Sequence, residues 1–378
     1  MRQAATTDCF AICAPGLEPL LLDELAELSI KGEAVAGGVE WHGSMSTIAL
    51  ANLWSRIASR IVLRVGNFHA RTFFELERHA KKIEWSRYLA SGSAVRFRVT
   101  CRKSKLYHSD AVAQRFQEAI ARSIGDVAIA DAGDDESEST AQTFIVRFER
   151  DQCTVSADTS GELLHRRGYR QAVAKAPLRE TLAAAMLRGA GWNGRGSLVD
   201  PMCGSGTIPI EAALIARKVP PGLTRDFAFL HWPEAATKPW TELVERAKSQ
   251  VLKSTPARIA GSDRDAGAIE AANSNAGRAG INDIDWMVQS VSAAEPVGES
   301  GLLIANPPYG ERIGDSDAIR NLYAQLGNVA RAKFAGWTIG ILSPDRALDA
   351  QLKLPLEVKL KTANGGIPVH LVTGVVAP

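Results

Sequence analysis

Apolar residues follow two different rhythms along the chain. Leucines recur at helical spacing between residues 17 and 28, whereas every second residue is apolar between residues 94 and 100. The first spacing is typical of a helix with one buried face, and the second is typical of a half-buried strand. Such segments succeed one another up to about residue 160. They predict a ferredoxin-like β-α-β-α unit over residues 1–60 and a second α+β unit over residues 61–160.

The elements expected in this first part come directly from these patterns. The expected strands are 9–13, 39–41, 60–65, 94–100, 143–147 and 152–157, the last two forming a hairpin, and the expected helices are 17–28, 46–55, 72–82 and 109–123. Residues 131–140 are polar and acidic with almost no apolar side chain, which predicts a mobile surface loop rather than a domain boundary.

From about residue 161 short apolar runs alternate with helical patterns. The runs are 197–200, 258–262, 285–288, 301–305 and 337–342. Strands that alternate with helices predict a parallel sheet covered on both faces, and right-handed crossovers bring the loops after its strands into one crevice. We therefore predict a Rossmann-like α/β domain over residues 161–378, with its functional site at the carboxyl ends of the strands.

Composition excludes several classes of protein. No apolar run approaches the roughly 18 residues of a membrane span, and the amino-terminal residues lack the apolar stretch of a signal peptide. The five cysteines form no CxxC pair, which argues against a zinc ribbon and against a secreted disulfide framework. We expect a cytoplasmic protein without a metal site.

Charge is unevenly distributed, although the net charge is only +2. Residues 54–125 contain fifteen Arg or Lys and five acids, a local excess of ten positive charges. Such a concentration is the electrostatic signature of a protein that binds a polyanion such as RNA, although a merely solvated basic face has the same composition.

A glycine-rich turn follows the strand at 197–200, in the sequence Asp-Pro-Met-Cys-Gly-Ser-Gly-Thr from Asp200. Gly204 and Gly206 allow the backbone to approach a ligand closely. The turn lacks both the GxGxxG spacing of dinucleotide sites and the lysine of a P-loop, so pyrophosphate is not the expected ligand. Asp200 is placed to face a cation such as a methionine ammonium group. Asp263 ends the next strand, where a carboxylate commonly accepts the two ribose hydroxyls, while Asp265 is positioned to cap the following helix.

The strand at 301–305 runs into Asn306-Pro307-Pro308-Tyr309. The two prolines fix the backbone and remove two N–H donors, which leaves the Asn306 side-chain oxygen and the Pro307 carbonyl as acceptors. A pair of fixed acceptors matches an exocyclic NH2 group, and Tyr309 can stack on a planar base. Catalysis would then consist mainly of positioning for in-line displacement, without a covalent nucleophile. Cys203 is interpreted as a small turn residue.

These motifs together resemble the THUMP-domain RNA guanine-N2 methyltransferases, and most closely the 23S ribosomal RNA group with a UPF0020-type methyltransferase domain. The resemblance rests on DPMCGSGT at 200–207 and NPPYGER at 306–312, together with LHRRGYR at 164–170 and APLRETLAA at 176–184, and it extends over nearly the whole chain. It implies a THUMP domain at 61–160 and S-adenosylmethionine as cofactor.

The resemblance also assigns the site. The cofactor would be held by Asp200, Pro201, Gly204, Gly206, Thr207, Asp263, Ser290 and Asn306, and the target base by Asn306, Pro307, Pro308 and Tyr309. Ser290 departs from the pattern, because the family usually has an aspartate there to contact the adenine amine.

The implied reaction is transfer of a methyl group to N2 of guanine in structured RNA, with ribosomal RNA favoured over tRNA. NPPY motifs also occur in enzymes that methylate adenine N6 or protein glutamine, and the basic region disfavours a protein substrate. A non-catalytic RNA-binding assembly factor is the other alternative. Only Ser290 supports it, and the intact motif at 306–309 opposes it.

Overall fold

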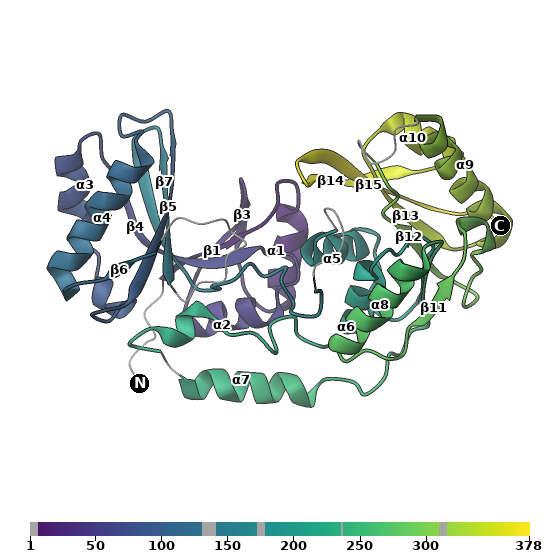
Figure 1. The fold of residues 1–378 in the computed structure, drawn as a ribbon, viewed down its shortest axis with the longest axis horizontal. Helices are drawn as coiled ribbons and strands as arrows, with labels where there is room; N and C mark the ends of the chain where they lie inside the picture. Colours follow the sequence, from purple (N-terminus) through teal and green to yellow (C-terminus); the bar gives the residue numbers. More distant parts are fainter. Residues whose placement is uncertain (1–6, 131–140, 172–177, 236, 310–315) are drawn as a thin grey trace.

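The chain folds into two mixed α/β bodies, each built around one sheet (Figure 1). The structure is a computed structural model that describes residues 7–130, 141–171, 178–235, 237–309 and 316–378. The loop predicted at 131–140 lies outside these residues.

The first sheet has eight strands in the order β2-β3-β1-β4-β8-β7-β5-β6. Its strands are β1 (Thr7–Ile12), β2 (Glu33–Val35), β3 (Gly38–Gly43), β4 (Arg60–His69), β5 (Ala94–Arg102), β6 (Ala128–Ile129), β7 (Gln142–Glu149) and β8 (Gln152–Asp158). Helices α1 (Glu18–Glu27), α2 (Met45–Trp54), α3 (Phe73–Ala80) and α4 (Ser109–Ile124), with the short 3-10 helix η1 (Trp85–Arg87), accompany it. The predicted ferredoxin-like order is confirmed with one extra strand, β2.

The two predicted amino-terminal units share this sheet. Strand β4 pairs antiparallel with β1 on one side and with β8 on the other, so the hydrogen-bonded ladder continues across residue 60. The hairpin predicted at 143–157 is β7 and β8, which pair antiparallel. The division of the chain at residues 60 and 160 stays a prediction.

The second sheet has seven strands in the order β11-β10-β9-β12-β13-β15-β14. They are β9 (Ser197–Asp200), β10 (Ile259–Asp263), β11 (Asp285–Val288), β12 (Gly301–Ala305), β13 (Thr338–Ser343), β14 (Glu357–Asn364) and β15 (Ile367–Val375). The helices in this part of the chain are α5 (Glu180–Gly189), α6 (Thr207–Ala216), α7 (Thr237–Ser249), α8 (Ala266–Arg278), α9 (Ser316–Lys333) and α10 (Arg346–Gln351), with 3-10 turns η2 (Ala228–His231) and η3 (Val291–Ala293). Of these, α7 packs against α2 of the first body (Figure 1).

The five strands expected in this domain are parallel neighbours, as predicted. Strands β14 and β15 were not predicted, and β15 pairs antiparallel with both β13 and β14. The expectation of a wholly parallel sheet is therefore corrected at this edge, where a hairpin rather than a crossover ends the chain.

Alternating side chains of the central strands enter two separate cores. Leu302 and Ile304 pack in the core that contains helices α5 and α6, whereas Leu303 and Ala305 pack in the core that contains Tyr323 of α9. Successive residues of a strand point to opposite faces, so this division means that both faces of the sheet are covered. The uncovered carboxyl ends of the strands are left for the site.

Candidate active site

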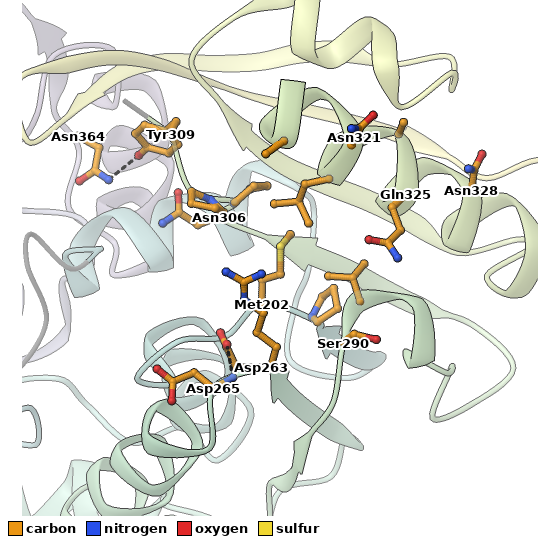
Figure 2. A pocket seen from close by; sticks show the side chains of 18 residues that line it. Met202, Asp263, Asp265, Ser290, Asn306, Tyr309, Asn321, Gln325, Asn328 and Asn364 are labelled. Carbon is orange, nitrogen blue, oxygen red and sulfur yellow. Dashed lines mark hydrogen bonds between the residues drawn. The ribbon is translucent and has the colours of Figure 1, made fainter. Parts of the chain in front are cut away.

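A cavity of about 1070 Å³ lies at the carboxyl ends of the parallel strands. The residues that follow four of these strands line it: Pro201 after β9, Asp263 at the end of β10, Ser290 after β11 and Asn306 after β12 (Figure 2). The predicted residues Pro307, Pro308 and Tyr309 line the same cavity. Sequence positions more than a hundred residues apart are thus brought together as the crossover argument requires.

The glycine-rich turn after β9 is held by close packing. Gly206 has φ +84°, and a Cβ there would come within 2.8 Å of the Trp286 ring and 2.9 Å of the Ala272 Cβ. Gly204 has φ +52° with open space around it, so its backbone angle rather than crowding favours glycine. Its N–H donates to Asp263 Oδ2 at 3.0 Å. The turn is therefore fastened to the end of β10.

Asp263 and Asp265 have different structural roles at the end of β10. Asp263 accepts hydrogen bonds from the Gly204 N–H and, at 3.0 Å, from the Asp265 N–H, and its carboxylate still faces the cavity. Asp265 precedes α8, where its side chain accepts the Gly267 N–H at 2.9 Å. The sequence-based expectation of a helix cap at Asp265 is confirmed. The ribose role of Asp263 stays a prediction.

Asp200 is buried beneath the turn rather than in the cavity wall. It is 1% exposed and accepts the Met202 N–H at 3.1 Å. Burial, reinforced by the nearby Asp263 carboxylate, raises the pKa of Asp200 to about 8. No described residue forms an ion pair with it. A buried carboxyl without a cation is chemically suited to an incoming ammonium group.

Three other predicted cofactor residues, Gly204, Gly206 and Thr207, are also absent from the cavity lining. They form the turn and the first residue of α6 behind it. Cys203 is buried in the same turn, and burial raises the pKa of its thiol. A thiol kept protonated is a poor nucleophile, in agreement with a small turn residue.

Ser290 and Val291, which follow β11, line another part of the cavity. The Ser290 Oγ lies 2.7 Å from the Ser292 Oγ, within hydrogen-bonding distance. The carboxylates among the lining residues are those of Asp263 and Asp265, on β10 and its following turn. A base bound beside Ser290 would therefore meet a hydroxyl group rather than a carboxylate.

Asn306 carries the least satisfied polar atom of the site. Its Oδ1 is buried and has no hydrogen-bond partner among the described residues. Buried acceptors are nearly always paired, and Asn306 lines the cavity, so this oxygen is a candidate acceptor for a donor on a bound ligand. Tyr309, which is only 8% exposed, has its hydroxyl 2.6 Å from Asn364 Nδ2, the donor of a hydrogen bond that Figure 2 marks.

The sequence did not point to the carboxamides that complete the wall. Asn321, Gln325 and Asn328 line the cavity from α9, and Asn364 lines it from β14 (Figure 2). Positions 321, 325 and 328 are spaced four and three residues apart, the repeat of one helix face, and this repeat is a signal that could have revealed the first three. Asn364 had no comparable signal.

These residues suit S-adenosylmethionine. The cavity volume is at the upper end of the range for small-molecule sites, and Asp263 lines the cavity, whereas Asp200 is buried behind its wall. Within the described ranges, no group of three His, Cys, Asp or Glu side chains is arranged to hold a metal ion. The helices of that same part of the chain are all too short or too polar to cross a membrane.

Comparison with known proteins agrees with this geometry. The model of the family described as "UPF0020: RMKL-like, methyltransferase domain" matches residues 167–373, and that of the RlmL ferredoxin-like domain matches residues 8–62. The RNA methyltransferase candidate slr0064 of Synechocystis is 35% identical, covering 97% of this chain and 96% of its own.

Two further relatives inform the cofactor and the chain length. The ribosomal RNA large subunit methyltransferase K/L of Syntrophotalea carbinolica is 36% identical over 96% of this chain, which spans only 52% of that protein. The crystal structure of SMU.472, a complex with SAH, superimposes over the whole of both chains with a TM-score of 0.88 at 31% identity. The chain belongs to the UPF0020, RMKL-like family and is an S-adenosylmethionine-dependent methyltransferase.

Proposed function

We propose that this enzyme methylates N2 of a guanine in structured RNA, with 23S ribosomal RNA as the favoured substrate. The single observation that supports the chemistry is the buried Oδ1 of Asn306, a cavity-lining residue, which has no hydrogen-bond partner among the described residues. An exocyclic amine supplies the donor that this oxygen lacks. When bound, S-adenosylmethionine would supply an electrophilic methyl group: the amine nitrogen would form a bond to the methyl carbon while the methyl–sulfur bond breaks, with S-adenosylhomocysteine as the leaving group, and the amine proton would pass to water.

The residues around Asn306 have separate tasks in this proposal. Asn306 Oδ1 accepts one amine hydrogen and so directs the nitrogen lone pair away from itself, toward the methyl group. Pro307 and Pro308 hold the backbone without adding N–H donors that would compete for the acceptors. Tyr309 offers a ring for the extruded base, which must leave its stack to expose the amine. Asp200 and Asp263 hold the ammonium and ribose of the cofactor.

RNA as the substrate is supported by the charge of the amino-terminal body. Many of its cations are neutralised, as in the pairs of Arg71 with Asp151 and of Arg115 with Glu77 and Glu118. The exposed cations that have no ion pair with a described residue include Arg78, Lys81, Lys82, Arg102, Lys103 and Lys105. The first three lie in α3 and directly after it; Arg102 ends β5, and Lys103 and Lys105 lie in the connection from β5 to α4. Free cations near one another are what a phosphate backbone binds.

The choice among substrates follows the relatives and the motifs. The K/L relatives are named for the large ribosomal subunit, which favours 23S RNA over tRNA. Asn306 would accept adenine N6 as readily as guanine N2, so the choice of guanine rests on the resemblance of the paired motifs.

Nucleoside mass spectrometry separates these alternatives. Purified enzyme and labelled S-adenosylmethionine are incubated with ribosomal RNA and tRNA from a strain lacking the gene. We expect N2-methylguanosine in the ribosomal RNA fraction. Finding N6-methyladenosine instead would mean that the target base is adenine, and finding the label in tRNA would mean that the substrate is tRNA. Cofactor binding without any label in either RNA would refute the proposal.

A further inference from the structure

Tyr309 is fixed at its far end by a residue outside its own motif. The phenol hydroxyl accepts a hydrogen bond from Asn364 Nδ2 at 2.6 Å, across 55 positions of sequence. A tyrosine ring has two side-chain rotations, and a bond at its hydroxyl restricts both. Both residues line the cavity, and in Figure 2 the bond lies at the end of the cavity where Asn306 is found.

Asn364 is itself held in a narrowly defined place. It is the last residue of β14 and pairs with Ile367 of β15 across Gly365 and Gly366. These glycines have φ of +58° and +82°, so both central residues of the turn are left-handed, as in a tight hairpin turn that glycine favours. The position of Asn364 is therefore set by the hairpin rather than by a loose loop.

The hairpin of β14 and β15 is connected through one intermediate strand, β13, to β12, the strand that precedes the motif at 306–309. β15 pairs with β13 from Thr338 to Ser343, and β13 pairs with β12, which ends at Ala305 beside Asn306. Asn364 thus belongs to the same hydrogen-bonded sheet as β12, the strand that leads directly into the 306–309 segment. A bond between two points of the same sheet can hold a side chain in a constant orientation.

We propose that Asn364 is a positioning residue that holds the Tyr309 ring in the plane needed to receive the target base. This inference rests on the proposed function, in which Tyr309 is the platform for the extruded base. Asn364 acts through Tyr309 and needs no contact with the reacting atoms. A purely structural role in the turn is the alternative, and it predicts no dependence on the Tyr309 hydroxyl.

A double-mutant cycle tests the link. Asn364→Ala, Tyr309→Phe and the double variant are compared with the wild type by single-turnover methylation of RNA at saturating cofactor and RNA. Loss of one hydrogen bond should slow each single variant roughly 3- to 10-fold, and the double variant should be no slower than the slower single variant. SAH affinity, measured by calorimetry, should stay within about twofold, since neither Asn364 nor the Tyr309 hydroxyl is assigned a contact with the cofactor.

Ala363→Ser is the matched control. Ala363 is exposed on the same strand, and its side chain points to the face opposite that of Asn364, so its rate should equal that of the wild type. Thermal melts check that every variant is folded. If Asn364→Ala is not folded, Asn364→Ser, whose side chain is too short to reach the Tyr309 hydroxyl, takes its place in the cycle.

Multiplying effects in the double variant, or a wild-type rate for Asn364→Ala, would overturn the positioning role. A wild-type enzyme that binds SAH yet methylates no RNA would instead point to failure of the proposed function. The two failures are therefore distinguishable.

Discussion

Asn306→Ala should abolish most catalysis without weakening the fold. The Oδ1 that it removes has no partner among the described residues, so no protein hydrogen bond of that oxygen is lost. Leaving a buried polar atom unsatisfied costs about 1–3 kcal/mol, and the free energy of unfolding should therefore be unchanged or higher in the variant. In the reaction the same oxygen is aligned on the target amine. Losing one such positioned group lowers kcat roughly 10²-fold, equivalent to about 2.7 kcal/mol of the barrier.

Asn52→Ala is the matched control because its amide is fully satisfied. Asn52 is completely buried; its Nδ2 donates to the Ile48 carbonyl and to Thr159 Oγ1, and its Oδ1 accepts from Ser160 Oγ. Removing this amide leaves buried partners unpaired, so it should destabilise the fold by about 1–3 kcal/mol while kcat stays near the wild-type value.

Single-turnover methylation and denaturant melts measure the two quantities on both variants. We expect opposite outcomes for two asparagine-to-alanine changes in one chain. An Asn306→Ala enzyme at nearly wild-type rate would refute the amine-acceptor role and with it the assignment of the site.

Three further predictions concern the cofactor and the RNA. Asp263→Ala should weaken cofactor binding by about 1.5–3 kcal/mol, the scale for hydrogen bonds to a charged group, and Ser290→Asp should hold or improve it; unchanged calorimetric affinity in Asp263→Ala removes that residue from the ribose role. Since burial raises the pKa of Asp200 to about 8, its carboxyl is protonated at pH 7, and pairing with an ammonium must expel that proton. SAH binding should thus tighten as pH rises from 6 toward 7.5 and release nearly one proton in calorimetry at pH 7, whereas Asp200→Asn should release none; equal release by both proteins contradicts the pairing. Replacing Arg102 at the end of β5 together with Lys103 and Lys105 after it should lower the slope of RNA affinity against salt and spare SAH binding. An unchanged slope would mean a solvated face there.

The central strands of the second sheet could be predicted because burial on both faces leaves continuous apolar runs. β12 is such a run, with Leu302 to Ala305 all buried. β14 could not be predicted in the same way. It is an edge strand in which only Leu360 is buried, and its charged, exposed side chains hide the strand period.

Some residues of the site could be predicted from the local sequence, whereas others are placed only by the tertiary structure. Asn306, Pro307 and Tyr309 are adjacent in sequence, and their chemistry could be predicted from residue type. The place of Asp200 beneath the turn rather than in the cavity wall depends on how the turn folds over it, which no local pattern specifies. Asn364 enters the cavity only because two antiparallel strands return to the sheet, so tertiary structure alone reveals it.

The continuous ladder through β4 has a consequence for how a substrate would be measured. A hinge between the two amino-terminal units would have to break the backbone hydrogen bonds between β1 and β4, so we expect the units to move together as one stiff arm. On the proposed function, the free cations of α3 and of the β5–α4 connection lie on that arm, while the target base is held in the other body. The distance between the cations that bind phosphates and the active site is then fixed, and the enzyme selects a nucleotide by its distance from the bound phosphates. Base pairs inserted in the RNA between the segment that binds these cations and the target guanine should abolish methylation rather than move it to a neighbouring guanine.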